Sequence, residues 1–176
     1  MNKKLKLWEL DRVSKSEFKE QKKFPIIIIL NNIRSLTNIG SFFRSSDAFN
    51  IEKIYLCGIT AKPPHREIQK TAIGSTESVS WEYYEEIIDL VNKLKAEGSM
   101  ICSIEQTEKT IFLQDLDISK SKKYVLIFGN EVNGVDQEII NLSDEIIEIP
   151  QFGTKHSLNV SVCAGILLWE FAKKHI

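Results

Sequence analysis

A continuous run of β-branched residues and leucine, Ile26–Leu30, constrains the fold of this chain more than any other feature. The run follows Pro25 and is far shorter than the ~20 apolar residues that a membrane-spanning helix needs. A strand with apolar side chains on both faces is typical of a parallel sheet that is covered by helices. We therefore expect an α/β fold with a mostly parallel sheet flanked by helices.

Other short apolar segments alternate with segments of helical periodicity. The order strand, helix, strand between residues 26 and 58 favours parallel pairing. A helix over 36–49 has Thr37 or Asn38 as its expected N-cap, and an amphipathic helix within 81–98 has Gly98 at its C′ position. The further expected strands are 53–58, 100–104, 124–128 and 145–149.

The chain has 176 residues, 43% hydrophobic and 27% charged, which suits one compact domain. Residues 1–24 carry eight Lys/Arg against four Asp/Glu, although the net charge of the whole chain is −1. We expect 1–24 to be a basic arm or short helix, with Ser14 or Ser16 as its cap ahead of Glu17, and 25–176 to be the main domain. No signal-peptide core is present, so we expect a cytoplasmic protein.

The three cysteines, Cys57, Cys102 and Cys163, lie far apart and have no histidine at metal-ligand spacing. Each has apolar neighbours in the sequence, so we interpret all three as buried thiols. We therefore expect no metal site.

The stretch Ile146–Lys173 predicts a short strand that ends at Pro150, a loop, and a helix that begins at Ser157. This helix is apolar on most faces, so it must be buried in the core or against a second subunit. The polar residues His156, Ser157 and Asn159 precede it. In open α/β sheets ligands bind at the carboxyl ends of strands, which makes this loop a candidate binding site.

The loop Gly129–Asp136 does not fit a calcium site, because an EF-hand glycine at Gly134 would put glycine and isoleucine at the first and last ligand positions. Neither glycine-rich phosphate-binding motif occurs in the chain. Polar loops follow the strands that end at 104, 128 and 149, and they meet at one edge if those strands are neighbours. Backbone amides and apolar walls there suit an adenosine without phosphate.

The segment Lys62–Gly74 is basic and rich in proline. Lys62, His65, Arg66 and Lys70 stand against a single acidic residue, Glu67. Such a loop suits contacts to phosphate groups, although a solvated surface loop would have the same composition.

Three sequence motifs stand out: N-x-G-x-x-x-R at Asn38–Arg44, F-G-N-E-x-x-G at Phe128–Gly134, and I-P-x-x-G-x-x-x-S-L-N-V-S-V at Ile149–Val162. They resemble the motifs of the SpoU (TrmH-like) RNA 2′-O-ribose methyltransferases of the SPOUT superfamily. The resemblance covers roughly residues 26–174, and Lys62–Gly74 also resembles a subset of that family.

The resemblance implies a SPOUT-type fold with a C-terminal trefoil knot, which general topology rules would argue against. It also implies S-adenosyl-L-methionine as cofactor and a homodimer that is formed through the C-terminal helix. By motif match the cofactor would be held largely through the backbone. The expected cofactor-binding residues are Ile104, Gly129, Ile149, Ser157 and Leu158.

The resemblance assigns Asn38, Arg44, Glu131, Ser157 and Asn159 to the catalytic centre, with a base-like role for Arg44. A guanidinium stays protonated in proteins, so our hypothesis is that Arg44 fixes the phosphate and ribose while the substrate helps to take the proton. Glu131 would position Arg44 or its own loop.

The expected reaction is methylation of a ribose 2′-hydroxyl of tRNA or rRNA, with tRNA favoured because the chain is small. Lys62, His65, Arg66 and Lys70 are the expected RNA contacts. Two alternatives remain: a non-catalytic RNA-binding module on the same scaffold, and an RNA base methyltransferase.

Overall fold

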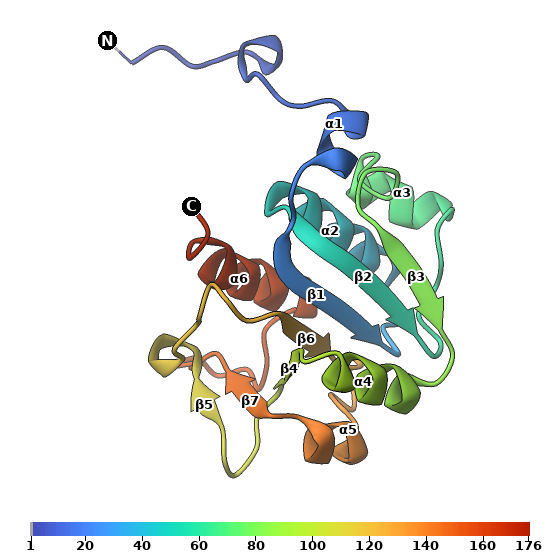
Figure 1. Cartoon of the computed structure of the whole chain (residues 1–176), viewed down its shortest axis with the longest axis vertical. Helices are drawn as coiled ribbons and strands as arrows, with labels where there is room; N and C mark the ends of the chain where they lie inside the picture. The colour runs from blue at the N-terminus through green and yellow to red at the C-terminus, as the bar shows by residue number, and fades with distance from the viewer. Residues whose placement is uncertain (1) are drawn as a thin grey trace.

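A computed structural model describes residues 2–176 and is built around one seven-stranded sheet (Figure 1). The strand order is β3-β2-β1-β6-β4-β7-β5, and all neighbouring strands are parallel. The predicted α/β class is therefore confirmed. The strands are β1 (Phe24–Asn31), β2 (Ile51–Cys57), β3 (Trp81–Tyr84), β4 (Met100–Ile104), β5 (Ile111–Phe112), β6 (Tyr124–Phe128) and β7 (Glu145–Glu148).

Helices cover both faces of the sheet. The larger buried cluster lies under α1, α2, α3 and α6, and the smaller one lies under α4 and α5. The α-helices are α1 (Lys15–Glu20), α2 (Leu36–Ala48), α3 (Arg66–Ala72), α4 (Ile87–Ala96), α5 (Gln137–Leu142) and α6 (Val160–Ala172), with short 3-10 helices at Leu7–Glu9 and Leu113–Asp115. Within residues 2–176, no helix has both the length and the apolar character that crossing a membrane requires.

Strand β1 lies near the centre of the sheet, between β2 and β6. Successive side chains of a strand point to opposite faces. Accordingly, Ile26, Ile28 and Leu30 join the larger cluster, while Ile27 and Ile29 join the smaller one. The strand is buried on both faces, as its apolar run predicts.

The order β6-β4-β7 makes neighbours of the three strands whose loops were expected to converge. Because these strands are parallel, their carboxyl ends meet at one edge of the sheet. The convergence that the sequence predicted is confirmed, and the trefoil knot remains a prediction from the resemblance.

The amphipathic helix expected within 81–98 is confirmed as α4, but the residues that open this stretch form a strand. Trp81 pairs with Ile54 of β2, so Trp81–Tyr84 forms the edge strand β3 and the helix begins only at Ile87. Aromatic residues fit a half-buried sheet surface well, which explains the strand. Gly98 has φ +85° immediately after the C-cap of α4, as expected for a C′ glycine.

Two expected helix starts are also shifted. Helix α2 is capped by Ser35, whose Oγ accepts the backbone N–H of Asn38 at 3.2 Å, and not by Thr37 or Asn38. Helix α6 does not begin at Ser157. It begins at Val160, because Asn159 is its N-cap and leaves Ser157 in the preceding loop. The expected cap Ser14 is confirmed, and it forms a capping box with Glu17 at the start of α1.

The basic segment Lys62–Gly74 is only partly a loop, because Arg66–Ala72 forms α3, which packs on α2. Gly40 of α2 permits this packing: a Cβ atom there would overlap Thr71 Oγ1 and the carbonyl oxygen of Ile68. The glycine of the first motif is thus required by a close approach of two helices.

Candidate active site

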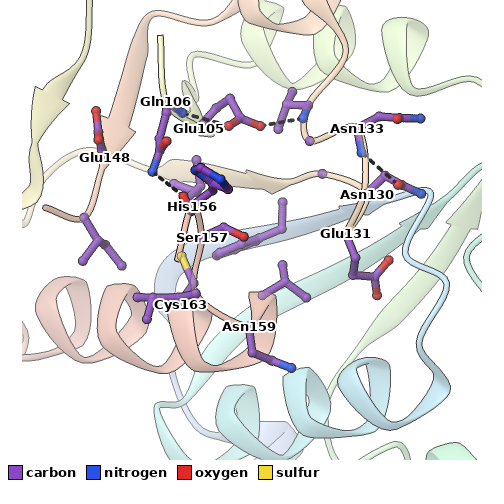
Figure 2. A pocket seen from close by; sticks show the side chains of 18 of the residues that line it. Glu105, Gln106, Asn130, Glu131, Asn133, Glu148, His156, Ser157, Asn159 and Cys163 are labelled. Carbon is purple, nitrogen blue, oxygen red and sulfur yellow. Dashed lines mark hydrogen bonds between the residues drawn. The ribbon is translucent and has the colours of Figure 1, made fainter. Parts of the chain in front are cut away.

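A cavity of about 640 Å³ lies at the carboxyl ends of β6, β4 and β7 (Figure 2). Its walls come from the loop after β4, the loop after β6 and the long loop between β7 and α6. All five expected cofactor-binding residues line it: Ile104, Gly129, Ile149, Ser157 and Leu158. The structure brings these residues together, and their role in binding remains a prediction.

The loop after β6 is a compact turn that is held by Asn130. Its Oδ1 accepts the backbone N–H groups of Val132 at 2.8 Å and Asn133 at 3.2 Å. The backbone groups of Asn130 and Gly134 bond to each other in both directions. A Cβ atom at Gly129 would overlap the backbone of Gly134, so glycine is needed where the chain leaves the strand.

Glu105, at the end of β4, connects the turn after β6 to its own strand. Its Oε2 accepts the N–H of Val135 at 2.9 Å and its Oε1 accepts the N–H of Gln106 at 2.8 Å. The Gln106 side chain donates to the carbonyl oxygen of His156 at 3.2 Å (Figure 2). Glu105 and Gln106 therefore connect the end of β4 to the loop after β6 and to the loop between β7 and α6. The sequence indicated only that polar groups stand at this strand end.

Asn38 of the first motif forms hydrogen bonds with residues of both other motifs. This residue lies in the first turn of α2 and is 8% exposed. Its Nδ2 donates to Glu131 Oε1 at 3.3 Å, and its Oδ1 accepts from Asn159 Nδ2 at 3.2 Å and Ser161 Oγ at 3.3 Å. With one donor and two acceptor contacts, the orientation of the Asn38 amide is fixed.

Ser161 was not among the residues expected in the site. Its hydroxyl also contacts Asn159 Oδ1 at 2.7 Å, while that same oxygen accepts the N–H of Ser161 at 2.9 Å as the cap of α6. Ser161 belongs to the third motif, two positions after Asn159. This spacing places it in the first turn of a helix once the helix start is assigned to Val160, and that is the signal that could have identified it.

Glu131 holds the segment that leads into α2. Its carboxylate accepts the N–H groups of Arg34 and Ser35, each at 3.0 Å, besides the Asn38 amide. Burial tends to raise the pKa of this carboxyl, but these hydrogen bonds outweigh burial and keep the pKa below its usual value. Glu131 was expected to position Arg44 or its own loop, but its side-chain hydrogen bonds are to the segment before α2 and to Asn38.

Arg44 lies apart from the other expected catalytic residues. Asn38, Glu131, Ser157 and Asn159 line the cavity, whereas Arg44 does not. It is exposed on α2, on the same helical stripe as Thr37 and Ala48. Within residues 2–176 its guanidinium forms no ion pair.

The four expected RNA contacts lie around the start of α3, outside the cavity lining. Lys62 Nζ stands 4.0 Å from the centre of the Tyr83 ring, and His65 caps α3 by accepting the N–H of Glu67 at 3.2 Å. Lys70 pairs with Glu67 at 2.7 Å, and Arg66 is exposed. His65 and Lys70 therefore also have structural contacts within α3.

Cys57 and Cys102 are buried, as expected, but Cys163 is only partly buried and lines the cavity. The expectation of three core thiols is therefore wrong for Cys163, because the first turn of α6 faces the cavity. Burial, with a further effect of Glu105, raises the pKa of the Cys163 thiol to about 12, so it stays protonated at neutral pH.

The chemistry of the lining distinguishes between possible ligands. Of the described residues that line the cavity, none is a lysine or an arginine, whereas Glu105, Glu131 and Glu148 are acidic. The apolar surfaces of Ile104 and Ile149 face the same space. Such a cavity fits an adenosine that carries a cationic group and no phosphate. A parallel sheet with such a cavity at its carboxyl edge is the arrangement of α/β proteins that bind a small ligand at this edge.

Comparison with known proteins assigns the family. Residues 25–169 match the model of the SpoU rRNA Methylase family. The chain belongs to this family, which confirms the resemblance of its three motifs.

Individual relatives and solved structures agree with this assignment. The chain is 31% identical over 160 residues to a tRNA (guanosine(18)-2′-O)-methyltransferase of Aquifex aeolicus, covering 88% of this chain and 72% of that protein. The crystal structure of the A. aeolicus TrmH/SpoU tRNA modifying enzyme has a TM-score of 0.82 at 27% identity, covering 92% of this chain and 80% of that one. An AdoMet-bound rRNA methyltransferase from Sinorhizobium meliloti has a TM-score of 0.79 at 26% identity, covering 94% of this chain and 62% of that one.

Proposed function

We propose that this protein is an S-adenosylmethionine-dependent methyltransferase that modifies a ribose 2′-hydroxyl of RNA, with tRNA as the favoured substrate. One observation carries the proposal: the Asn38 amide joins residues of all three family motifs at the rim of a nucleoside-sized cavity. Family membership and the printed names of the relatives support the same reaction.

The donor, when bound, supplies a methyl group on a positively charged sulfur. The side chains of Ile104, Ile149 and Leu158 would contact its apolar parts, and the backbone groups of Gly129 and Ser157 would bond its polar atoms. The carboxylates that line the cavity complement its positive charge. S-adenosylmethionine carries no phosphate, so its site needs no phosphate-binding loop. This agrees with the absence of both glycine-rich phosphate-binding motifs from the sequence.

For the acceptor, Asn38 and Asn159 offer amide groups in a fixed orientation near the cavity rim. These groups would align the ribose so that its 2′-oxygen approaches in line with the methyl group. Glu131 keeps Asn38 in place and, with a lowered pKa, is a weak proton acceptor. The proton would therefore leave through the substrate or solvent, while Arg44 binds the neighbouring phosphate.

We infer a homodimer, which would account for the exposed position of Arg44 outside the cavity. Val162, Ile166 and Trp169 recur at helical spacing along α6 and are 53%, 40% and 51% exposed. A second copy that covers this stripe would satisfy the expectation that the apolar helix is buried. Helix α2 packs beside α6, so Arg44 would then lie close to the interface between the two copies.

RNA recognition would involve segments outside the cavity. We propose that the arm 1–24, which is anchored to the methyltransferase domain 25–176 through Phe18, contacts RNA together with Lys62, His65, Arg66 and Lys70. A cytoplasmic location, where RNA is available, belongs to the same proposal.

The test is a methyl-transfer assay with labelled donor and RNA from cells that lack the gene. We expect label in the tRNA fraction, and nuclease digestion with nucleoside mass analysis should place it on ribose. Label on a base would identify a base methyltransferase. RNA binding with neither labelling nor heat of donor binding in calorimetry would identify a non-catalytic RNA-binding module.

A further inference from the structure

A second groove, of about 480 Å³, lies at the opposite end of the sheet from the active-site cavity. Its lining includes Phe24 at the start of β1 and Glu52 near the start of β2. Lys120 precedes β6, and His175 follows α6. The groove is therefore formed at the amino ends of the strands by four segments that are distant in the sequence, around residues 22–25, 52, 120 and 175.

The charge of this groove is strongly positive. Three lysines line it, Lys22, Lys23 and Lys120, and the one carboxylate among the described lining residues is Glu52. That carboxylate is paired with Lys123 at 2.6 Å. Of the residues that the structure describes, none forms an ion pair with Lys22 or Lys120.

The third lysine is also not neutralised by an ion pair. Lys23 Nζ donates to the carbonyl oxygen of Phe18 and to Asn50 Oδ1, both uncharged acceptors. Its partial burial, only partly offset by Asp47, lowers the pKa of Lys23 below the usual value. The Lys23 ammonium has lost part of its hydration and has no anionic partner in an ion pair. An external anion that reached it would therefore be bound favourably.

The groove also has an aromatic wall. The rings of Phe24 and His175 stack with centroids 4.8 Å apart and planes inclined by 18°. Both rings are half-buried, and burial together with Lys120 lowers the pKa of His175. His175 is therefore mostly neutral at neutral pH, and the positive charge of the groove comes from its lysines.

We propose that this groove binds the phosphate backbone of the substrate RNA at a distance from the methylated nucleotide. The inference deepens the proposed function and rests on it. Charge complementarity selects the ligand, because several unpaired lysines around one groove match a phosphodiester chain. Strand β1 has eight residues, so the groove and the cavity are about 25 Å apart. An RNA that reaches both must be longer than a few nucleotides.

The experiment compares two double variants with equal changes of charge. The groove variant is Lys22→Glu with Lys120→Glu. The control is Lys93→Glu with Lys95→Glu on α4, which covers the other face of the sheet. Filter binding of tRNA-sized RNA from cells lacking the gene is measured between about 50 and 200 mM salt. Thermal melting and calorimetry with the donor show whether both variants remain folded and bind the donor.

We expect the groove variant to bind this RNA at least about fivefold more weakly than the control, with a salt slope lower by about 2. The loss should be smaller for transfer to a short fragment that carries the target nucleotide, because such a fragment does not reach the groove. Lys22→Arg with Lys120→Arg should retain wild-type affinity. Equal affinity and slope in the groove variant and the control would overturn the inference. A wild type that binds RNA but transfers no methyl group would instead overturn the proposed function.

Discussion

The side-chain amide of Asn159 donates to Oδ1 of Asn38 at 3.2 Å and so joins residues that are 121 positions apart in the sequence. The first residue belongs to the cap of α6 and the second to the first turn of α2. Because Asn38 also contacts Glu131, a single amide connects the three motifs. Mutations around this amide should therefore affect the reaction more than the binding of the donor.

Ser161→Ala removes a hydroxyl whose single proton is shared between Asn159 Oδ1 at 2.7 Å and Asn38 Oδ1 at 3.3 Å. A lost hydrogen bond of about 1 kcal/mol corresponds to a fall in kcat of roughly fivefold. The affinity for the donor should not change, and Ser161→Thr should restore most of kcat because it keeps the hydroxyl. A rise of KM with kcat unchanged would contradict this positioning role. Steady-state kinetics with both variants separate the two results.

Glu131→Gln should reduce stability in a manner that depends on pH. The pKa of Glu131 is below its usual value of 4.5 in the folded protein, so its carboxylate stabilises the fold above pH 4.5 and loses this effect as the pH falls through the lowered value. Because Glu131 is solvent-exposed and therefore screened, the difference between wild type and variant should stay below about 1 kcal/mol at pH 7 and should shrink below pH 4.5. Urea unfolding from pH 7 downward measures it.

The matched control for Glu131→Gln is Glu138→Gln, at an exposed position of α5. This control should leave the free energy of unfolding nearly unchanged at every pH. A Glu131 variant whose deficit stays constant down to pH 3 would show that the lowered pKa is not the source of the stabilisation.

Arg44→Ala should abolish most methyl transfer, by about 100-fold or more, because a fixed guanidinium can align a phosphate with two hydrogen bonds. Binding of the donor should remain, since Arg44 does not line the cavity. Arg44→Lys should be intermediate, as an ammonium keeps the charge but loses the planar geometry. Transfer rates and donor calorimetry are both needed, and full activity of Arg44→Ala would exclude the residue from the reaction.

Ile166→Glu should convert a homodimer into a monomer, because it puts a charge in the centre of the exposed apolar stripe of α6. Ile59→Glu is the control: Ile59 is 65% exposed, just beyond the end of β2 and away from α6. Light scattering at several protein concentrations gives the mass. A wild-type protein that is already monomeric would disprove the proposed dimer.

Much of the fold could be predicted from the pattern of residues. The apolar run Ile26–Leu30 predicted a strand buried on both faces, and its two buried clusters confirm this. Trp81–Tyr84 could not be assigned locally, because its aromatic residues also fit the helical periodicity that continues through Val91. Only pairing with β2 makes this segment a strand, and pairing is a tertiary effect.

For the site, the motifs identified which residues come together but not how they are connected. Ile104, Gly129 and Leu158 line one cavity, as expected. The links made by Ser161 and Glu105 depend on a helix start and a turn geometry that the sequence leaves open. The location of Arg44 outside the cavity also could not be predicted, because a linear motif does not tell which face of a helix points to the ligand.

The position of Asn159 at the start of the last helix has a consequence for biosynthesis. The elements β1, β4 and β6 are synthesised before the segment that supplies Ser157 and Asn159. Domains generally fold as units. A chain that lacks this segment therefore has neither the last wall of the cavity nor the contact to Asn38. The contacts of Asn38 with Asn159 and Ser161 form only when α6 packs against α2. Activity should therefore begin only when folding is complete.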